Sequence, residues 1–153
     1  MATTSASGPT ATARAAELAA ELRFAVMRLG RRLRQHAPED VTPSQLSALS
    51  VIVREERLTL SQLAEAERVQ PPTITRIVDS LVGKGLATRT VSEKDRRVAW
   101  VAPTAEGRAL VDAIRRRRDA YLATRLRALP PEDLAALARA AVLLERLTED
   151  PEP

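Results

Sequence analysis

The chain has 153 residues, no cysteine, one histidine and a formal net charge of +4. Its length can bury a hydrophobic core, while the missing cysteines exclude a disulfide framework and a thiolate zinc site. A single histidine argues against a histidine-based triad or a multi-histidine metal site, so we expect no catalytic residues, no metal and no cofactor.

The first 13 residues, MATTSASGPTATA, are rich in Ala, Thr and Ser and lack the apolar segment of a secretory signal. No apolar run in the chain approaches the ~20 residues of a membrane-spanning helix. We therefore expect residues 1–13 to form a disordered tail, and the protein to be cytoplasmic with no membrane partner.

Residues 14–36 are predicted to form the first helix. Apolar residues recur in steps of three and four, which marks one face of a helix, at Leu18, Leu22, Val26, Leu29 and Leu33. The stripe is narrow, which favours packing against another helix. Pro38 ends the segment.

The next three helices have clear start and stop signals. Residues 42–45 and 59–62 each place a threonine three positions before a glutamine, which is the pattern of a capping box. A further helix is predicted from Pro71 to Lys84, and Gly85 supplies the left-handed residue that ends it. Its apolar stripe follows helical spacing, at Ile74, Ile77, Val78, Leu81 and Val82.

A β-hairpin is predicted after this helix. Residues 86–91 are rich in β-branched side chains and residues 97–102 form the matching strand, with residues 92–96 as the charged loop between them. Trp100 lies on the second strand, and we expect it to pack between the hairpin and the core.

Two helices complete the chain. Thr104 is expected to cap a long helix that runs to about Leu126, and Pro130-Pro131 interrupts it. The last helix is predicted to reach residue 148 with an apolar face made by Leu134, Leu137, Ala138, Ala141, Leu144 and Leu147.

The order helix, turn, helix, hairpin over residues 59–102 is that of a winged helix-turn-helix. The fold is therefore predicted to be mainly α with a small β-hairpin wing, together with a helical region. In such a motif the second helix enters the DNA major groove. With its stripe turned inward, spacing places Asp79 on the outer face together with the residues predicted to contact bases or phosphates, which are Pro72, Thr73, Thr75 and Arg76. The alternative, an amphipathic core helix with a polar outer face, does not account for the tandem capped helices and the charged hairpin.

Two blocks, PPTITRIVDSLVGKGL (residues 71–86) and EKDRRVAWVAPTAEG (residues 93–107), resemble the MarR family of bacterial transcriptional regulators. The second block contains the Asp-x-Arg of the family's wing, here Asp95 and Arg97, followed by a strand and Thr104. The resemblance implies an obligate homodimer in which residues 14–36 and 104–148 form the dimerisation region and residues 42–103 the DNA-binding domain.

The resemblance also implies roles in DNA binding. Arg97 would enter the minor groove and Asp95 would hold its guanidinium group. A narrow minor groove has an enhanced negative potential that attracts arginine. Lys94 and Arg96 would contact phosphates, as would Ser61 or Gln62 at an earlier helix start. Gln70 departs from the family pattern, in which a serine or threonine commonly caps the recognition helix.

Some members of the family bind phenolic or other small aromatic acids in a cleft between the dimerisation helices and the winged helix. In this chain such a cleft would draw on Phe24, Met27, Arg28, His36 and Gln45. A surface histidine near a helix end is the simpler interpretation of His36.

We therefore expect a homodimeric regulator that binds a pseudo-palindromic site in double-stranded DNA and acts as a repressor, with a small-molecule effector as a further partner. The alternative is a helical protein–protein adaptor that retains a winged-helix scaffold without binding DNA. With one histidine, no cysteine and no Gly-rich phosphate loop, an enzyme is not expected.

Overall fold

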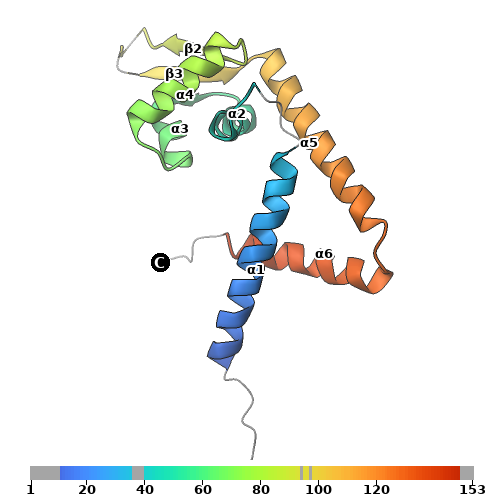
Figure 1. Cartoon of the computed structure of the whole chain (residues 1–153). Coiled ribbons are helices and arrows are strands. Elements are labelled where there is room, and N and C mark those ends of the chain that lie inside the picture. The colour runs from blue at the N-terminus through green and yellow to red at the C-terminus, as the bar shows by residue number, and fades with distance from the viewer. Residues whose placement is uncertain (1–10, 36–39, 94, 97, 149–153) are drawn as a thin grey trace, which may run out of the picture. The chain divides into compact units, whose positions relative to one another are not determined.

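The computed structural model describes residues 11–35, 40–93, 95–96 and 98–148, and these ranges form six helices and three short strands (Figure 1). A mainly helical fold with a small sheet is thus confirmed. The contacts within the chain divide it into two compact units, residues 1–111 and residues 112–153. The elements are α1 (Ala11–Arg34), α2 (Pro43–Glu55), β1 (Leu58–Thr59), α3 (Leu60–Ala66), α4 (Pro71–Gly83), β2 (Ala87–Val91), β3 (Ala99–Pro103), α5 (Ala105–Leu126) and α6 (Pro131–Arg146).

Both predicted capping boxes are present. Thr42 Oγ1 accepts a hydrogen bond from Gln45 N at 3.3 Å, and Gln45 Oε1 accepts one from Thr42 N at 3.1 Å. Thr59 and Gln62 make the same pair of bonds at 3.2 and 2.9 Å. These side chains satisfy N–H groups that have no partner inside the helix, so they fix where α2 and α3 begin.

The predicted stop at Gly85 is also confirmed. Gly85 has φ +71°, its N–H donates to Val82 O at 2.9 Å, and the N–H of Leu86 donates to Leu81 O at 2.9 Å. This is the Schellman arrangement, which requires a left-handed residue at the position that Gly85 occupies. It turns the chain from α4 directly into β2.

The sheet has three strands in the order β1-β3-β2, so the expectation of a two-stranded hairpin was incomplete. The strand that sequence analysis missed is β1, which pairs with β3 through Leu58 opposite Val101. A tight turn at Glu56 (φ 61°), closed by a 2.6 Å bond from Arg57 N to Glu55 O, leads the chain from α2 into this strand. The short strand therefore ties the sheet to the end of α2.

The core of residues 41–111 lies between α2, α3, α4 and the sheet, and its fully buried side chains include Leu49, Ile52, Leu63, Ile74, Val78, Leu81 and Val101. Three of the five residues in the predicted stripe of α4 are buried, and Ile77 is half-buried. The prediction for Val82 was wrong, because its side chain is 38% exposed. The stripe thus orients α4 with its remaining side toward solvent.

The junction between the wing and α5 is held by Thr104. Its hydroxyl donates to Gly85 O at 2.7 Å and accepts from Gly107 N at 3.0 Å. A Cβ at Gly107 would lie 2.0 Å from Leu86 O, so only glycine permits this close approach. The first turn of α5 is therefore fixed against the end of the α4–β2 turn.

The outer helices follow the prediction with changed ends. α1 begins at Ala11, so residues 11–13, which were assigned to the tail, belong to the helix. α6 ends at Arg146 and buries none of its side chains. No helix in the described part of the chain is both long enough and apolar enough to cross a membrane.

Candidate nucleic-acid interface

The solvent-facing side of α4 carries the side chains predicted to read DNA. Pro72, Arg76 and Asp79 recur at helical spacing on the face opposite the buried stripe, and all three are exposed. In Figure 1, α4 lies beside the β2–β3 hairpin, and contacts between α4 and β2 agree with this. The helix and the wing can thus act on neighbouring parts of one surface.

The two threonines at the start of α4 differ in what they can offer a ligand. Thr73 is exposed. Thr75 is half-buried, and its hydroxyl donates to the carbonyl of Pro71 at 2.9 Å. Because that proton is already used, Thr75 presents its methyl group and an acceptor oxygen, which suit a base edge better than a phosphate.

An ion pair that sequence analysis missed joins α4 to the wing. Arg89 in β2 places NH1 2.9 Å from Oδ1 of Asp79. Helical spacing placed Asp79 on the outer face, but nothing in the sequence pairs it with Arg89. Asp79 meets Arg89 only because β2 holds Arg89 beside α4, and the position of β2 is set by the packed sheet.

The tip of the wing is closed by hydrogen bonds around the charged loop. Ser92 N donates to Val98 O at 2.8 Å, Val98 N donates to Asp95 O at 2.9 Å, and Asp95 N donates to Ser92 Oγ at 3.4 Å. Asp95 and Arg96 are exposed. Lys94 and Arg97 lie outside the described residues, so the predicted pairing of Asp95 with Arg97 stays a prediction.

The predicted phosphate contacts on α3, Ser61 and Gln62, are exposed at its first turn. Gln62 Oε1 accepts bonds from both the N–H and the hydroxyl of Thr59, at 2.9 and 3.0 Å. The side-chain amide of Gln62 therefore keeps its NH₂ donors for a phosphate while its oxygen caps the helix.

Trp100 is half-buried in β3, and the guanidinium of Arg57 lies 4.5 Å from the centre of its ring. This cation–π contact helps to stabilise the pairing of β1 with β3, in which Trp100 lies opposite Thr59. Arg57 was not recognised from sequence, because its partner becomes its neighbour only through β1.

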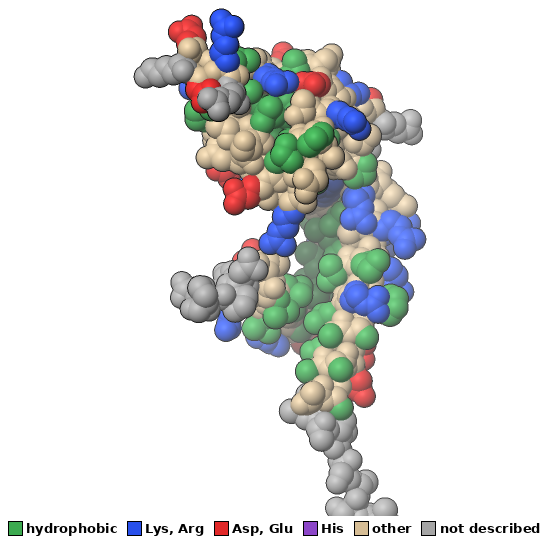
Figure 2. All heavy atoms as spheres, turned by 90° about the vertical axis from the view of Figure 1, so that its left-hand side faces the viewer, with side chains coloured by type: hydrophobic (Ala, Val, Ile, Leu, Met, Phe, Trp, Pro, Cys, Tyr) green, Lys and Arg blue, Asp and Glu red, His purple; other side chains and the backbone are tan. Residues whose placement is uncertain are grey.

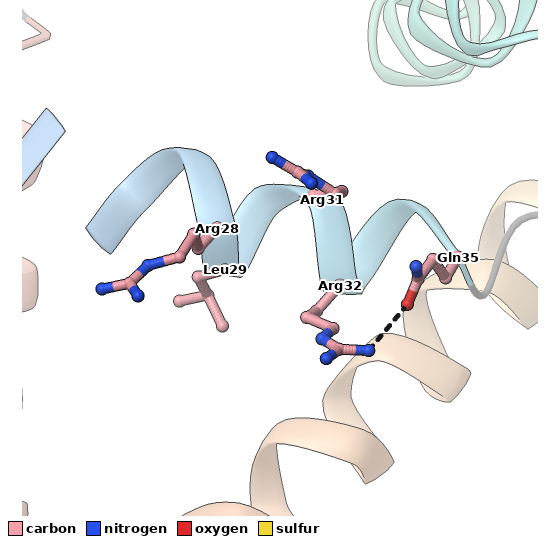
Figure 3. Close-up of a pocket in the computed structure, with 5 residues that line it drawn as sticks. All are labelled: Arg28, Leu29, Arg31, Arg32 and Gln35. Atoms are coloured by element: carbon pink, nitrogen blue, oxygen red, sulfur yellow. Dashed lines mark hydrogen bonds between the residues drawn. The ribbon is translucent and has the colours of Figure 1, made fainter. Parts of the chain in front are cut away.

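The structure describes four of the five residues predicted to line an effector cleft, so the cleft stays a prediction. Among the described residues, an open depression of about 450 Å³ is lined by four residues of α1 and by Gln35 just after it; the four are Arg28, Leu29, Arg31 and Arg32. Figure 3 shows Arg28, Leu29 and Arg32 on one side of the helix and Arg31 on the other. Of the predicted set, this depression includes Arg28.

The structure describes three of the four remaining residues of the predicted cleft. Phe24 and Met27 are exposed on α1, and His36 lies outside the described residues. Gln45 uses its oxygen in the capping box and donates its Nε2 to Ser80 Oγ at 2.8 Å. The oxygen of that amide therefore caps α2, and its nitrogen joins α2 to α4. Among the residues that the structure describes, no three His, Cys, Asp or Glu side chains form a group that could hold a metal ion.

Comparison with known proteins shows the family of the chain. Residues 41–99 match the model of the MarR family. An uncharacterized HTH-type transcriptional regulator of Mycobacterium leprae, ML2140, is 41% identical over 138 residues, which span 89% of this chain and 96% of that protein. The chain belongs to the MarR family. It is thus related to transcriptional regulators, which are not enzymes.

Two further similarities extend this assignment. The HTH-type transcriptional repressor MdtR of Bacillus subtilis is 32% identical to this MarR-family chain over 114 residues, 74% of each protein. The crystal structure of Streptococcus pneumoniae FabT in complex with DNA matches with a TM-score of 0.65 and 24% identity, over 88% of this chain and 94% of that one. The second likeness shows that the fold is the same.

Proposed function

We propose that this MarR-family protein is a homodimeric repressor that binds a pseudo-palindromic site in double-stranded DNA. The observation that carries the proposal is the exposed face of α4, which presents Pro72, Thr73 and Arg76 beside a charged wing. Arginine can grip a guanine edge with two parallel hydrogen bonds, and the major groove admits a helix. The repressor MdtR and the DNA complex of FabT support the same function.

Exposed apolar side chains on the outer helices support the homodimer. α1 exposes Phe24, Val26 and Met27, and α6 exposes Leu137 and Leu144. Figure 2 shows hydrophobic side chains at the surface of α1, the helix that continues into the lower grey tail. Helices with uncovered apolar faces are stable in water when a partner covers them.

Selection of DNA from a random pool tests this function. We expect an enriched palindrome whose half-sites lie about one helical turn (10–10.5 base pairs) apart. Arg76→Ala should weaken binding and relax the sequence preference at one position of each half-site, whereas Lys94→Ala and Arg96→Ala should weaken all sequences alike and flatten the salt dependence. A pool with no enriched duplex would favour the protein–protein adaptor.

We also propose a small aromatic acid as effector. The side of α1 that carries Arg28 and Arg32 next to Leu29 offers cationic and apolar surface together, which suits a carboxylate on an aromatic ring (Figure 3). Titration of the protein–DNA complex with benzoate should release DNA, and Arg28→Ala should abolish the release. Benzyl alcohol, which lacks the charge, is the matched ligand control.

A further inference from the structure

Asp79 puts a negative charge on the side of α4 that is proposed to face DNA. It is the only acidic residue of α4 and lies three positions after Arg76, with 56% of its side chain exposed. Duplex DNA carries one negative charge for about every 1.7 Å of its axis. A bare carboxylate at this position would therefore be repelled as the helix enters the groove.

Arg89 is placed to cancel that charge. In the register of the sheet Arg89 lies opposite Val101, which is fully buried. Residues opposite each other on paired strands project from the same face, so Arg89 projects from the face of the sheet that packs on the helices. From this face the guanidinium reaches the rim of α4 and meets Asp79 at 2.9 Å. The Arg89 side chain is 34% exposed, so most of it is covered by the protein.

Stability alone does not explain the pair. Exposed ion pairs contribute little to folding, because water screens the charges and ordering two side chains costs entropy. More than half of the Asp79 side chain is in contact with solvent. The main consequence of the pair is instead that it reduces the negative charge on the outer face of α4.

We propose that Arg89 is a positioning residue that neutralises and holds Asp79, so that the outer face of α4 can approach the DNA backbone. This inference rests on the proposed DNA-binding function. In this proposal Arg89 influences DNA binding through Asp79 and does not contact DNA itself.

A double-mutant cycle on the selected duplex, measured by fluorescence anisotropy, tests the inference. Arg89→Ala should weaken binding about 10-fold, because the carboxylate is left uncompensated near phosphates. Asp79→Asn alone should change affinity by less than about 3-fold. The double variant Asp79→Asn/Arg89→Ala should recover to within about 3-fold of the unmodified protein, a rescue that marks coupled residues.

Two controls separate this effect from net charge and from folding. Arg14→Ala removes the same charge from an exposed pair with Glu17 on α1, 3.4 Å apart, and should leave affinity within about 2-fold. Arg89→Lys keeps a cation in the wing and should bind within about 3-fold of the unmodified protein. Thermal unfolding followed by circular dichroism should give similar midpoints for all variants.

Each contrary outcome has one meaning. A loss in Arg89→Ala that persists in the double variant would show that Arg89 contacts DNA itself, and would overturn the inference. Unchanged affinity in Arg89→Ala, or a loss in Arg89→Lys equal to that in Arg89→Ala, would overturn it as well. Failure of the unmodified protein to bind any duplex would overturn the proposed function and this inference together.

Discussion

Arg68 has a backbone conformation that glycine usually provides. Its φ is 53°, its N–H donates to Glu65 O at 3.0 Å, and Val69 N donates to Ala64 O at 3.0 Å. These bonds end α3 in the same Schellman arrangement that ends α4 at Gly85. A side chain in the left-handed region costs roughly 1–2 kcal/mol, so the turn before α4 stores strain that the turn after it does not.

Arg68→Gly should therefore stabilise the protein by about 0.5–1 kcal/mol, since the relief of strain exceeds the entropy that glycine adds to the unfolded chain. The thermal midpoint should rise by about 2 °C. The reciprocal change Gly85→Ala should lower it. A Cβ at Gly85 would meet no atom within 4 Å, so that loss reports backbone conformation alone. A lower midpoint for Arg68→Gly would contradict the argument.

Most ends of the elements in the winged helix could be predicted because their signals are local. Thr42 and Thr59 each bond to a glutamine three residues later, and Gly85 ends α4 by its own positive φ. The strand β1 could not be predicted in this way. It has two residues, and its partners Trp100 and Val101 lie far along the chain, so it exists only once the sheet is packed.

The error at Val82 has a similar cause. At about 100° per residue, Ile77 and Val82 fall on the two flanks of a stripe whose centre is Ile74, Val78 and Leu81. The periodicity marks all five as apolar. Whether a flank is covered depends on neighbouring elements, and here Ile77 is half-buried and Val82 exposed.

Helix α4 begins without a side-chain cap, and the two prolines of its first turn explain why this is tolerated. Gln70 at the N-cap makes no capping bond. Pro71 and Pro72 have no N–H, and the first N–H of the helix, that of Thr73, donates to Gln70 O at 2.9 Å. Few donors are therefore left for a cap to satisfy, unlike at Thr59.

Replacing Thr59 and Gln70, the N-cap residues of α3 and α4, should have unequal effects. Thr59→Ala should destabilise the protein by about 1 kcal/mol, because it leaves N–H groups at the start of α3 unpaired. Gln70→Ala should change stability by only a few tenths of a kcal/mol, since no cap bond is lost. Urea unfolding curves measure both. Equal losses would show that Gln70 has a stabilising contact of its own.

At the scale of the whole molecule, the candidate DNA surface was predictable in part. Periodicity alone placed Pro72, Arg76 and Asp79 on the outer face of α4. The partner of Asp79 was not predictable, because Arg89 reaches it through a strand register that depends on β3. The bond from Gln45 to Ser80 was not predictable either, because it joins residues 35 positions apart that meet only when α2 packs on α4.

The proposed assembly makes affinity for a palindrome depend on α6. Leu134, Leu137 and Leu144 share one face of this helix, and Leu137 is 47% exposed. Leu137→Glu would place a charge in the proposed interface, where it has no partner, so the protein should become monomeric. Light scattering after size-exclusion chromatography measures this change.

Affinity for the full palindrome should then fall about 100-fold, because two linked half-site contacts become two independent ones. Val142→Glu is the matched control, since it adds the same charge to an exposed apolar residue away from the Leu137 face. A dimeric Leu137→Glu variant with unchanged operator affinity would show that α6 does not join two subunits. Loss of the dimer without loss of affinity would show that one winged helix suffices for the site.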